Sequence, residues 1–394
     1  MKCVDGNPAS NIHKEPAGSK RERRLDAFDP TWRRFIRDLT RCSPALEDLA
    51  ESFPALLFAL TSGYGTPRAR ERAFEQVAAG APLRAASDAL ALPWWLRKLP
   101  AQAFMAPLPR FPADPEFSVR ITSLIPEESP RCPAWLARVA YGFEASGRIY
   151  ALWIARQHHV VGGPTKEVLS YMAAWAWYSE RPGLIGHRLL RRPWTPEMSF
   201  RRACEELLAW RERLRLVDYL GPGLASPWLA DGTAGDYTFV ALRTPDDFIA
   251  ESEALDNCLD QYAERLHGGR VAVFSIRKDG RSVACVEIGL HEEEVTMPAI
   301  VQLRAARNKR ASPEVWQATF AWLGAQRLEP MSPRRHGARS DDRTLARRAL
   351  WMPYLQFLKG TPHLQEFRRL ALREQANPRR LVGRRPAPRP TAPA

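Results

Sequence analysis

At 394 residues the chain is long enough for two or three domains, and its 45% hydrophobic content with 13 tryptophans excludes a disordered protein. It has no apolar run near the roughly 20 residues of a membrane span and no apolar segment typical of a signal peptide, so we expect a cytoplasmic protein. The six cysteines form no C-x-x-C pair, which argues against a zinc site or a disulfide framework.

The net charge of +14 is concentrated at one end of the chain. Residues 327–394 contain 16 Lys and Arg against 5 Asp and Glu, an excess of +11, whereas residues 236–326 contain 10 against 14, or −4. A basic segment attracts polyanions such as nucleic acid, an acidic protein or an anionic membrane surface. A solvated tail that only aids solubility is the alternative interpretation.

The N-terminal half is expected to be mostly helical. Residues 1–28 mix Gly, Pro, Ser, Lys and Arg without periodicity and predict a disordered arm. Helical patterns fill residues 29–235, interrupted by a Pro-rich connection at 106–130. One helix is predicted over 44–60 with a bend at Pro54, because proline removes a helical hydrogen bond.

Tryptophans at helical spacing suggest two roles for this helical region. They could form a stacking platform for nucleic-acid bases or a buried aromatic core, and the spacing favours the core. The residues concerned are Trp153, Trp175, Trp177, Trp194 and Trp210. His158, His159 and His187 lack a residue that would complete a metal coordination set, so we expect no metal and no cofactor.

Residues 236–326 alone show clear strand periodicity and predict a small core of a β-meander with helices. Thr244 and Asp247 are spaced for a capping box, so a helix should begin at Pro245. β-branched and aromatic runs predict strands at 237–243, 271–277, 282–289 and 299–305. Helical patterns predict a segment at 256–267, with Leu255, Leu259, Tyr262 and Leu266 as its buried stripe, and a last helix at 313–325.

Asp279-Gly280 predicts a tight turn between the strands at 271–277 and 282–289. This turn would place Arg277 opposite Ser282 and Ile276 opposite Val283, and would fix the register beyond them. Two apolar faces follow, and helices should cover both. The first holds Ala272, Phe274, Ile276, Val283, Cys285 and Glu287, and the second holds Val271, Val273, Ser275, Ala284, Val286 and Ile288.

Glu287 is the residue whose surroundings need an explanation. A carboxylate on an apolar face must be paired, hydrogen-bonded or protonated. Gln302 or Arg304 would be its partner if the strand at 299–305 lies beside the strand at 282–289. One interpretation is a polar cluster that fixes the strand register. The other is a general acid or base, or a carboxylate that binds a ligand.

Cys258 is the candidate nucleophile, because it lies near an expected helix start, where the helix dipole lowers a thiol pKa. Asn257 cannot serve as its base, and His267 should face elsewhere. Cys258 also borders the buried stripe, so a small core residue is the alternative. The candidate residues for a catalytic or ligand-binding site are Glu287, Cys258, Gln302, Asn308 and Tyr262.

This core is similar to the PcfJ-like proteins, a family encoded on conjugative plasmids, phages and related bacterial elements. The family pattern reads H-C-V-G-x-Y, then T-x-E-I, then Q-x-R-G-x-x-N. It is matched by Cys258, Tyr262, Glu287, Gln302, Arg304 and Asn308, and it is departed from at Asn257, Asp260, Cys285 and Ala305. The His–Cys pair of the pattern is therefore absent. The resemblance implies a setting in mobile-element DNA biology, with other mobile-element proteins as partners and no established reaction.

The expected fold class is α+β, with a mostly helical N-terminal region, a small mixed core and a helical basic C-terminus. Residues 327–376 would form the basic helical segment, and residues 377–394 a disordered tail rich in Pro and Arg. Contacts to phosphate would come from Arg334, Arg335, Arg347, Arg348, Arg368, Arg369, Arg379 and Arg380.

Two functions remain open from the sequence. The first is a non-enzymatic accessory protein of a mobile element that contacts DNA or RNA through its basic C-terminus. The second is an enzyme or small-ligand binder whose site includes Glu287, Gln302 and Asn308. A weaker third idea is a scaffold whose tryptophan-rich helices bind a partner protein. No phosphate-binding loop, dinucleotide fingerprint or hydrolase motif suggests a substrate.

Overall fold

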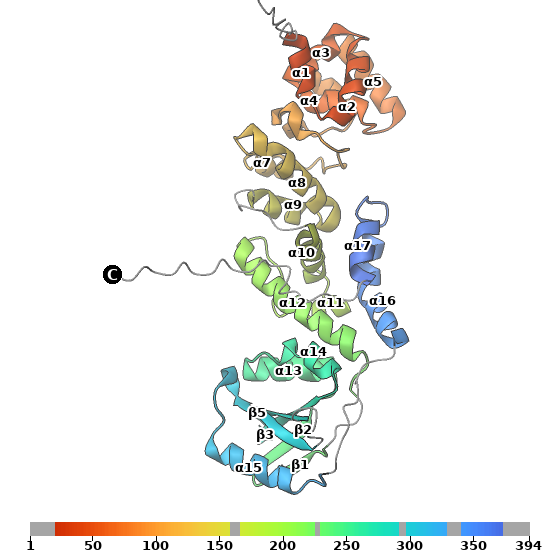
Figure 1. The fold of residues 1–394 in the computed structure, drawn as a ribbon. Helices are drawn as coiled ribbons and strands as arrows, with labels where there is room; N and C mark the ends of the chain where they lie inside the picture. The colour runs from red at the N-terminus through yellow and green to blue at the C-terminus, as the bar shows by residue number, and fades with distance from the viewer. Residues whose placement is uncertain (1–19, 158–165, 225–228, 291–296, 329–339, 373–394) are drawn as a thin grey trace, which may run out of the picture. The chain divides into compact units, whose positions relative to one another are not determined.

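The computed structural model describes residues 20–157, 166–224, 229–290, 297–328 and 340–372. The chain divides into two compact units, Met1–Val161 and Gly162–Ala394. The fold is α+β, as predicted, because helices make up the first unit and one antiparallel sheet lies in the second (Figure 1).

The first unit consists of short helices around one apolar cluster that includes Leu56, Phe58, Trp95 and Trp135. Proline is the first residue of five of its described helices, where the missing N–H costs no helical hydrogen bond. The helices are α1 (Lys20–Asp26), α2 (Pro30–Thr40), α3 (Pro44–Ser52), α4 (Pro54–Thr61), α5 (Pro67–Ala78), α6 (Leu83–Ala89), α7 (Pro115–Thr122), α8 (Cys132–Ser146) and α9 (Arg148–Arg156), with 3-10 turns at Trp94–Lys98, Ala101–Ala103 and Ser129–Arg131.

Three predictions for this unit need correction. Helix α1 lies within the segment 1–28 that was predicted to be a disordered arm, while residues 1–19 lie outside the described residues. The helix predicted over 44–60 is two helices, because Phe53 between α3 and α4 is not helical, with φ −157° and ψ 72°. The Pro-rich connection at 106–130 contains α7, whose N-cap Asp114 accepts a hydrogen bond from the N–H of Glu116.

The helical part of the second unit is held together by aromatic side chains. It comprises α10 (Lys166–Ser179), α11 (Ile185–Arg188), α12 (Phe200–Leu220), α16 (Ser340–Phe357) and α17 (Leu364–Leu372). Trp351 of α16 is fully buried against Trp210 of α12, with ring centroids 5.9 Å apart. The Tyr178 hydroxyl of α10 donates to the carbonyl of Leu350. The helices α16 and α17 therefore belong to the core of this unit.

The predicted role of the tryptophans as buried core is confirmed. Each of the five is at most 6% exposed, which excludes a base-stacking platform or a partner-binding patch made from them.

Helix α12 carries charged residues into the interior. Arg213 is 1% exposed and pairs with Asp260 at 3.0 Å, and it also reaches Glu253 at 2.9 Å. Arg215 pairs with Glu212 of the same helix at 2.9 Å and with Glu264. These ion pairs join α12 to the core domain, because Asp260 and Glu264 follow α13 (Pro245–Leu255) in the 3-10 turn η4 (Leu259–Gln261) and in α14 (Ala263–His267).

The sheet is a five-stranded antiparallel meander in the order β1-β2-β3-β4-β5. Its strands are β1 (Gly232–Ala234), β2 (Tyr237–Ala241), β3 (Val271–Lys278), β4 (Arg281–Leu290) and β5 (Pro298–Ala305). Helices α13 and α14 lie on one side of the sheet and α15 (Pro313–Gly324) lies on the other, as Figure 1 shows. The four predicted strands are present, and β1 was not predicted.

The predicted hairpin register is wrong beyond the turn. Lys278 pairs with Arg281 and Arg277 with Ser282, as expected, but Ile276 then pairs with Ala284 because Val283 is an extra residue in a bulge. Relative to β3, this one-residue shift moves the β4 side chains after Val283 to the opposite face of the sheet from the one predicted. Glu287 consequently lies opposite Val273, and Cys285 opposite Ser275.

The corrected register separates an apolar face from a polar one. The face toward α15 holds Phe239, Phe274, Ile276, Ala284, Val286 and Leu303, packed on Trp322. The face toward α13 and α14 holds Ser275, Cys285, Glu287 and Gln302. The prediction of two apolar faces was therefore wrong, whereas the prediction that helices cover both was right.

Candidate functional site

The segment between α13 and α14 brings polar side chains onto the sheet. Helix α13 begins with the predicted capping box of Thr244 and Asp247 and ends at Asp256, a non-glycine residue with φ 48°. The side-chain oxygen of Asn257 then accepts the N–H of Leu259 at 3.1 Å, which starts the 3-10 turn. The helix predicted over 256–267 is thus broken, although its predicted stripe is buried.

Glu287 is the centre of the site and is 2% exposed. The Tyr262 hydroxyl donates to its Oε2 at 3.4 Å, and the Arg265 guanidinium forms an ion pair with its Oε1. Gln302 lies directly opposite Glu287 in the register of β4 and β5, and its amide donates to the Tyr262 hydroxyl. Of the two partners considered from the sequence, Gln302 joins the cluster, whereas Arg304 lies opposite Cys285.

Burial controls the acid–base properties of this cluster. It raises the pKa of Glu287, and it outweighs the opposite effects of the Arg265 charge and of hydrogen bonds from Tyr262 and Gln302. It also raises the pKa of Tyr262, to which the Glu287 charge adds. A carboxyl with a raised pKa beside a phenol can exchange a proton with a ligand.

The two cysteines of the core lie beside this cluster, each next to an asparagine. The amide of Asn257 contacts Cys285 Sγ at 3.7 Å, and the amide of Asn308 contacts Cys258 Sγ at 3.9 Å. Burial raises the pKa of the Cys285 thiol to about 12, with a further contribution from the carboxylate of Glu251. Cys285 is therefore a neutral thiol, which suits a packing role better than a nucleophilic one.

The five candidate residues form two groups of contacts, Glu287 with Tyr262 and Gln302, and Cys258 with Asn308. Two further residues, Arg265 and Glu251, lie on the same side of the sheet. Arg265 lies one turn after Tyr262, so the helical spacing that singled out Tyr262 could have found it. Glu251 is 3% exposed and accepts a hydrogen bond from Ser282 at 2.8 Å, and burial raises its pKa. Its signal was a charge on the buried stripe of α13, between Phe248 and Leu255.

The predicted phosphate-binding arginines differ in their exposure and in their ion pairs. Arg347 is only 15% exposed and pairs with Asp218 of α12 at 2.6 Å, so it fastens α16 to the helical core. Arg348, Arg368 and Arg369 are exposed and form no ion pair within the described residues. Arg334, Arg335, Arg379 and Arg380 lie outside the described residues, as does the predicted tail at 377–394.

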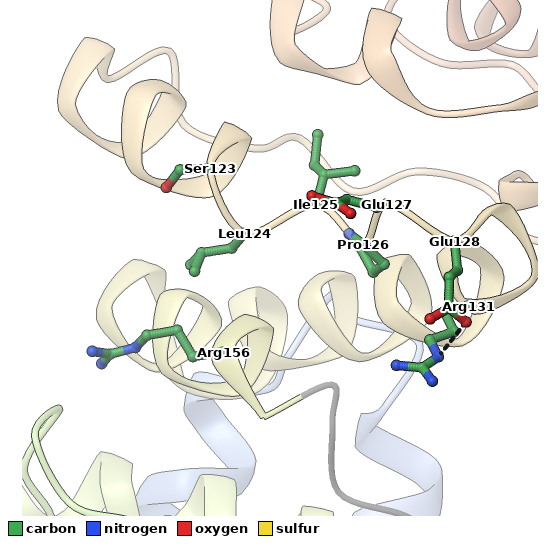
Figure 2. A pocket seen from close by; sticks show the side chains of 8 residues that line it. All are labelled: Ser123, Leu124, Ile125, Pro126, Glu127, Glu128, Arg131 and Arg156. Carbon is green, nitrogen blue, oxygen red and sulfur yellow. Dashed lines mark ion pairs between the residues drawn. The ribbon is translucent and has the colours of Figure 1, made fainter.

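A cavity of about 470 Å³ lies in the first unit, between the loop after α7 and the end of α9 (Figure 2). Its polar wall includes Arg131, which is neutralised by Glu128 at 3.0 Å, and Arg156. The remaining lining residues are Ser123, Leu124, Ile125, Pro126 and Glu127. None of the candidate residues lines this cavity.

Neither a metal site nor a membrane span is found where the structure describes the chain. No group of three or more His, Cys, Asp or Glu side chains there could hold a metal ion. His187 contacts the carbonyl of Tyr178 through Nδ1 at 2.9 Å, and His158 and His159 lie outside the described residues. No described helix combines the length and apolar character that a bilayer crossing requires.

Comparison with known proteins finds a similarity in the core. Residues 229–320 match the family model of the PcfJ-like proteins, which confirms the resemblance over the sheet and its helices. No curated protein and no solved structure matches the chain. The family match includes the whole polar cluster on the sheet, whereas the first unit and helices α16 and α17 lie outside it.

Proposed function

We propose that this chain, with its PcfJ-like core, is a nucleic-acid-associated accessory protein of a bacterial mobile element. Its outer arginines on α16 and α17 contact phosphate, and other proteins of the element are its assembly partners. The observation that supports this proposal is that some arginines of these helices are paired with an acidic residue and others are not. Arg343 and Arg347 are held by Asp218, whereas Arg348, Arg368 and Arg369 are exposed without an acidic partner among the described residues.

Exposed, unpaired guanidinium groups on a packed helical surface suit sequence-tolerant contact with a phosphate backbone. The packing of α16 and α17 keeps them in place, because Tyr354 of α16 and Phe367 of α17 are buried with ring centroids 4.7 Å apart. Deleting everything after residue 327 would expose this aromatic core, so such a truncation cannot isolate the role of the charges. Point substitutions are required.

The test is the affinity of the full chain for a labelled 30-nucleotide single-stranded DNA at low salt, with an RNA of the same length in parallel. The variant Arg348→Gln/Arg368→Gln/Arg369→Gln should bind about tenfold more weakly or worse. The control Arg68→Gln/Arg72→Gln/Arg281→Gln removes the same charge from exposed residues elsewhere. Equal affinities of the two variants would refute the proposal.

The polar cluster on the sheet supports a second candidate function, a binding site for a small ligand. The observation that favours it is the convergence of Glu287, Tyr262 and Gln302 beneath Arg265, whose side chain is 48% exposed. A ligand that displaces Arg265 would find a carboxyl acceptor next to a guanidinium. A nucleotide offers both complementary groups, a base with N–H donors and a phosphate.

This candidate is tested by the thermal shift that nucleoside mono-, di- and triphosphates produce on the full chain. At least one should raise the Tm of the wild type and fail to raise that of the Gln302→Leu variant. An equal shift in both proteins, or none in either, would reject the site.

A further inference from the structure

A basic turn directly after β5 borders the polar cluster. Residues 304–310 contain four cationic side chains and no acidic one, and we call Arg304, Arg307, Lys309 and Arg310 the basic rim. Arg307, Lys309 and Arg310 are exposed. Within the described residues the rim has one ion pair, Arg307 with Asp256 at 3.3 Å, and both side chains are more than 70% exposed. Such an exposed pair neutralises little of the charge.

The backbone holds the rim in one conformation. Arg307 and Asn308 are consecutive non-glycine residues in the left-handed region, with φ 57° and 56°. The N–H of Ala305 donates to the carbonyl of Lys309 at 3.0 Å, and the backbones of Arg304 and Arg310 form an isolated antiparallel β-bridge. The charges are thus presented from a closed turn, so the backbone loses little conformational freedom when the side chains bind a ligand.

Two observations place the turn that carries the rim beside the polar cluster. The amide of Asn308 contacts Cys258 Sγ at 3.9 Å, and Arg304 lies opposite Cys285 in the register of β4 and β5. An anion bound along the rim would therefore lie next to the region that contains Glu287.

We propose that the basic rim is a second phosphate-binding surface, which holds a nucleic-acid backbone against the PcfJ-like core beside the polar cluster. The proposal rests on the nucleic-acid association proposed above and adds a contact that α16 and α17 do not supply. A polyanionic strand fits the rim because the rim combines several exposed charges on one hydrogen-bonded turn with only one weak acidic partner among the described residues.

The test compares three full-length variants in the single-stranded DNA assay. Arg307→Gln/Lys309→Gln/Arg310→Gln should weaken binding about tenfold and reduce the dependence of log K on log salt by about 2, because three phosphate contacts are lost. The charge-retaining variant Arg307→Lys/Lys309→Arg/Arg310→Lys should bind within about threefold of wild type. The triple substitution of Arg68, Arg72 and Arg281 is the control for net charge.

The outcomes separate this inference from the proposed function. If the rim variant binds like the charge control while the variant of Arg348, Arg368 and Arg369 binds weakly, the rim proposal fails and the proposed function stands. If the wild type does not bind at low salt, both fail. If the rim substitutions abolish binding of poly-glutamate and leave DNA binding unchanged, the rim recognises an acidic protein, and the nucleic-acid assignment is overturned.

Discussion

Glu287 illustrates how two opposing effects act on one buried carboxyl. Desolvation disfavours its charged form, whereas the Arg265 ion pair and the hydrogen bonds from Tyr262 and Gln302 favour it. The net effect is a raised pKa, so the folded protein retains a proton at pH values where the unfolded chain has lost it. Glu251 behaves in the same way on the same face of the sheet.

A pH prediction follows for Glu287→Gln. Because the folded-state pKa lies above the ordinary value of 4.5, the stability from the protonated carboxyl is complete below pH 4.5 and is lost as the pH rises to the folded-state pKa. The variant has no such loss. The difference in Tm, variant minus wild type, should therefore increase upward from pH 4.5 in thermal unfolding experiments. A difference that stays constant or decreases would show that the pKa is not raised.

The sequence identified Glu287, Tyr262 and Gln302 but assigned Glu287 to the wrong face. A bulge at Val283 leaves no mark in an apolar strand, because the pattern of alternation there is apolar on both sides. Helical spacing could have marked Arg265 and Glu251, but it could not show their partners, Glu287 and Ser282, because these lie on a strand whose register was predicted wrongly.

At the scale of elements, ion pairs of buried arginines on α12 join this helix to the turn η4 and to α14 of the core domain. The side chain of Asp260 is 8% exposed, and its charge is compensated by Arg213, which is 47 residues away along the chain. No local spacing predicts such a contact. By contrast, the capping box at Thr244 and the Asp279-Gly280 turn were predictable, because local side-chain and backbone chemistry determines both.

The substitution Arg213→Ala should lower the free energy of unfolding by about 3–5 kcal/mol, because it leaves the carboxylate of Asp260 buried and unpaired. Its control is Arg201→Ala on the same helix. Arg201 is 91% exposed and lies 3.9 Å from Glu205, so its loss should cost less than about 0.5 kcal/mol. Urea denaturation measures both, and equal costs would contradict the role given to Arg213.

Helix α16 provides a second matched pair. Trp351 is fully buried, whereas its neighbour Met352 is 48% exposed. Trp351→Ala should cost about 3–5 kcal/mol of unfolding free energy through the cavity that it leaves, and Met352→Ala should cost about 0.5 kcal/mol or less. If Trp351→Ala were as mild as Met352→Ala, α16 would not be part of the core of the second unit.

At the scale of the whole molecule, strand periodicity confined to residues 236–326 beside a helical pattern elsewhere predicted the α+β class. The basic segment after residue 327 was harder to interpret, because charge alone does not reveal which arginines face inward. Arg347 and Arg348 are adjacent in sequence, yet Arg347 pairs with Asp218 and Arg348 is exposed. Only the packing of α16 on α12 separates a structural arginine from one that is available to a partner.

The most direct test of the account is the salt dependence of single-stranded DNA binding by the wild-type chain. If α16, α17 and the basic rim supply six contacts, from Arg348, Arg368, Arg369, Arg307, Lys309 and Arg310, log K should fall linearly with log salt with a slope of about −4. A slope of about −2 would indicate that only one of the two surfaces binds. Binding that does not change with salt, or no binding at low salt, would contradict the account.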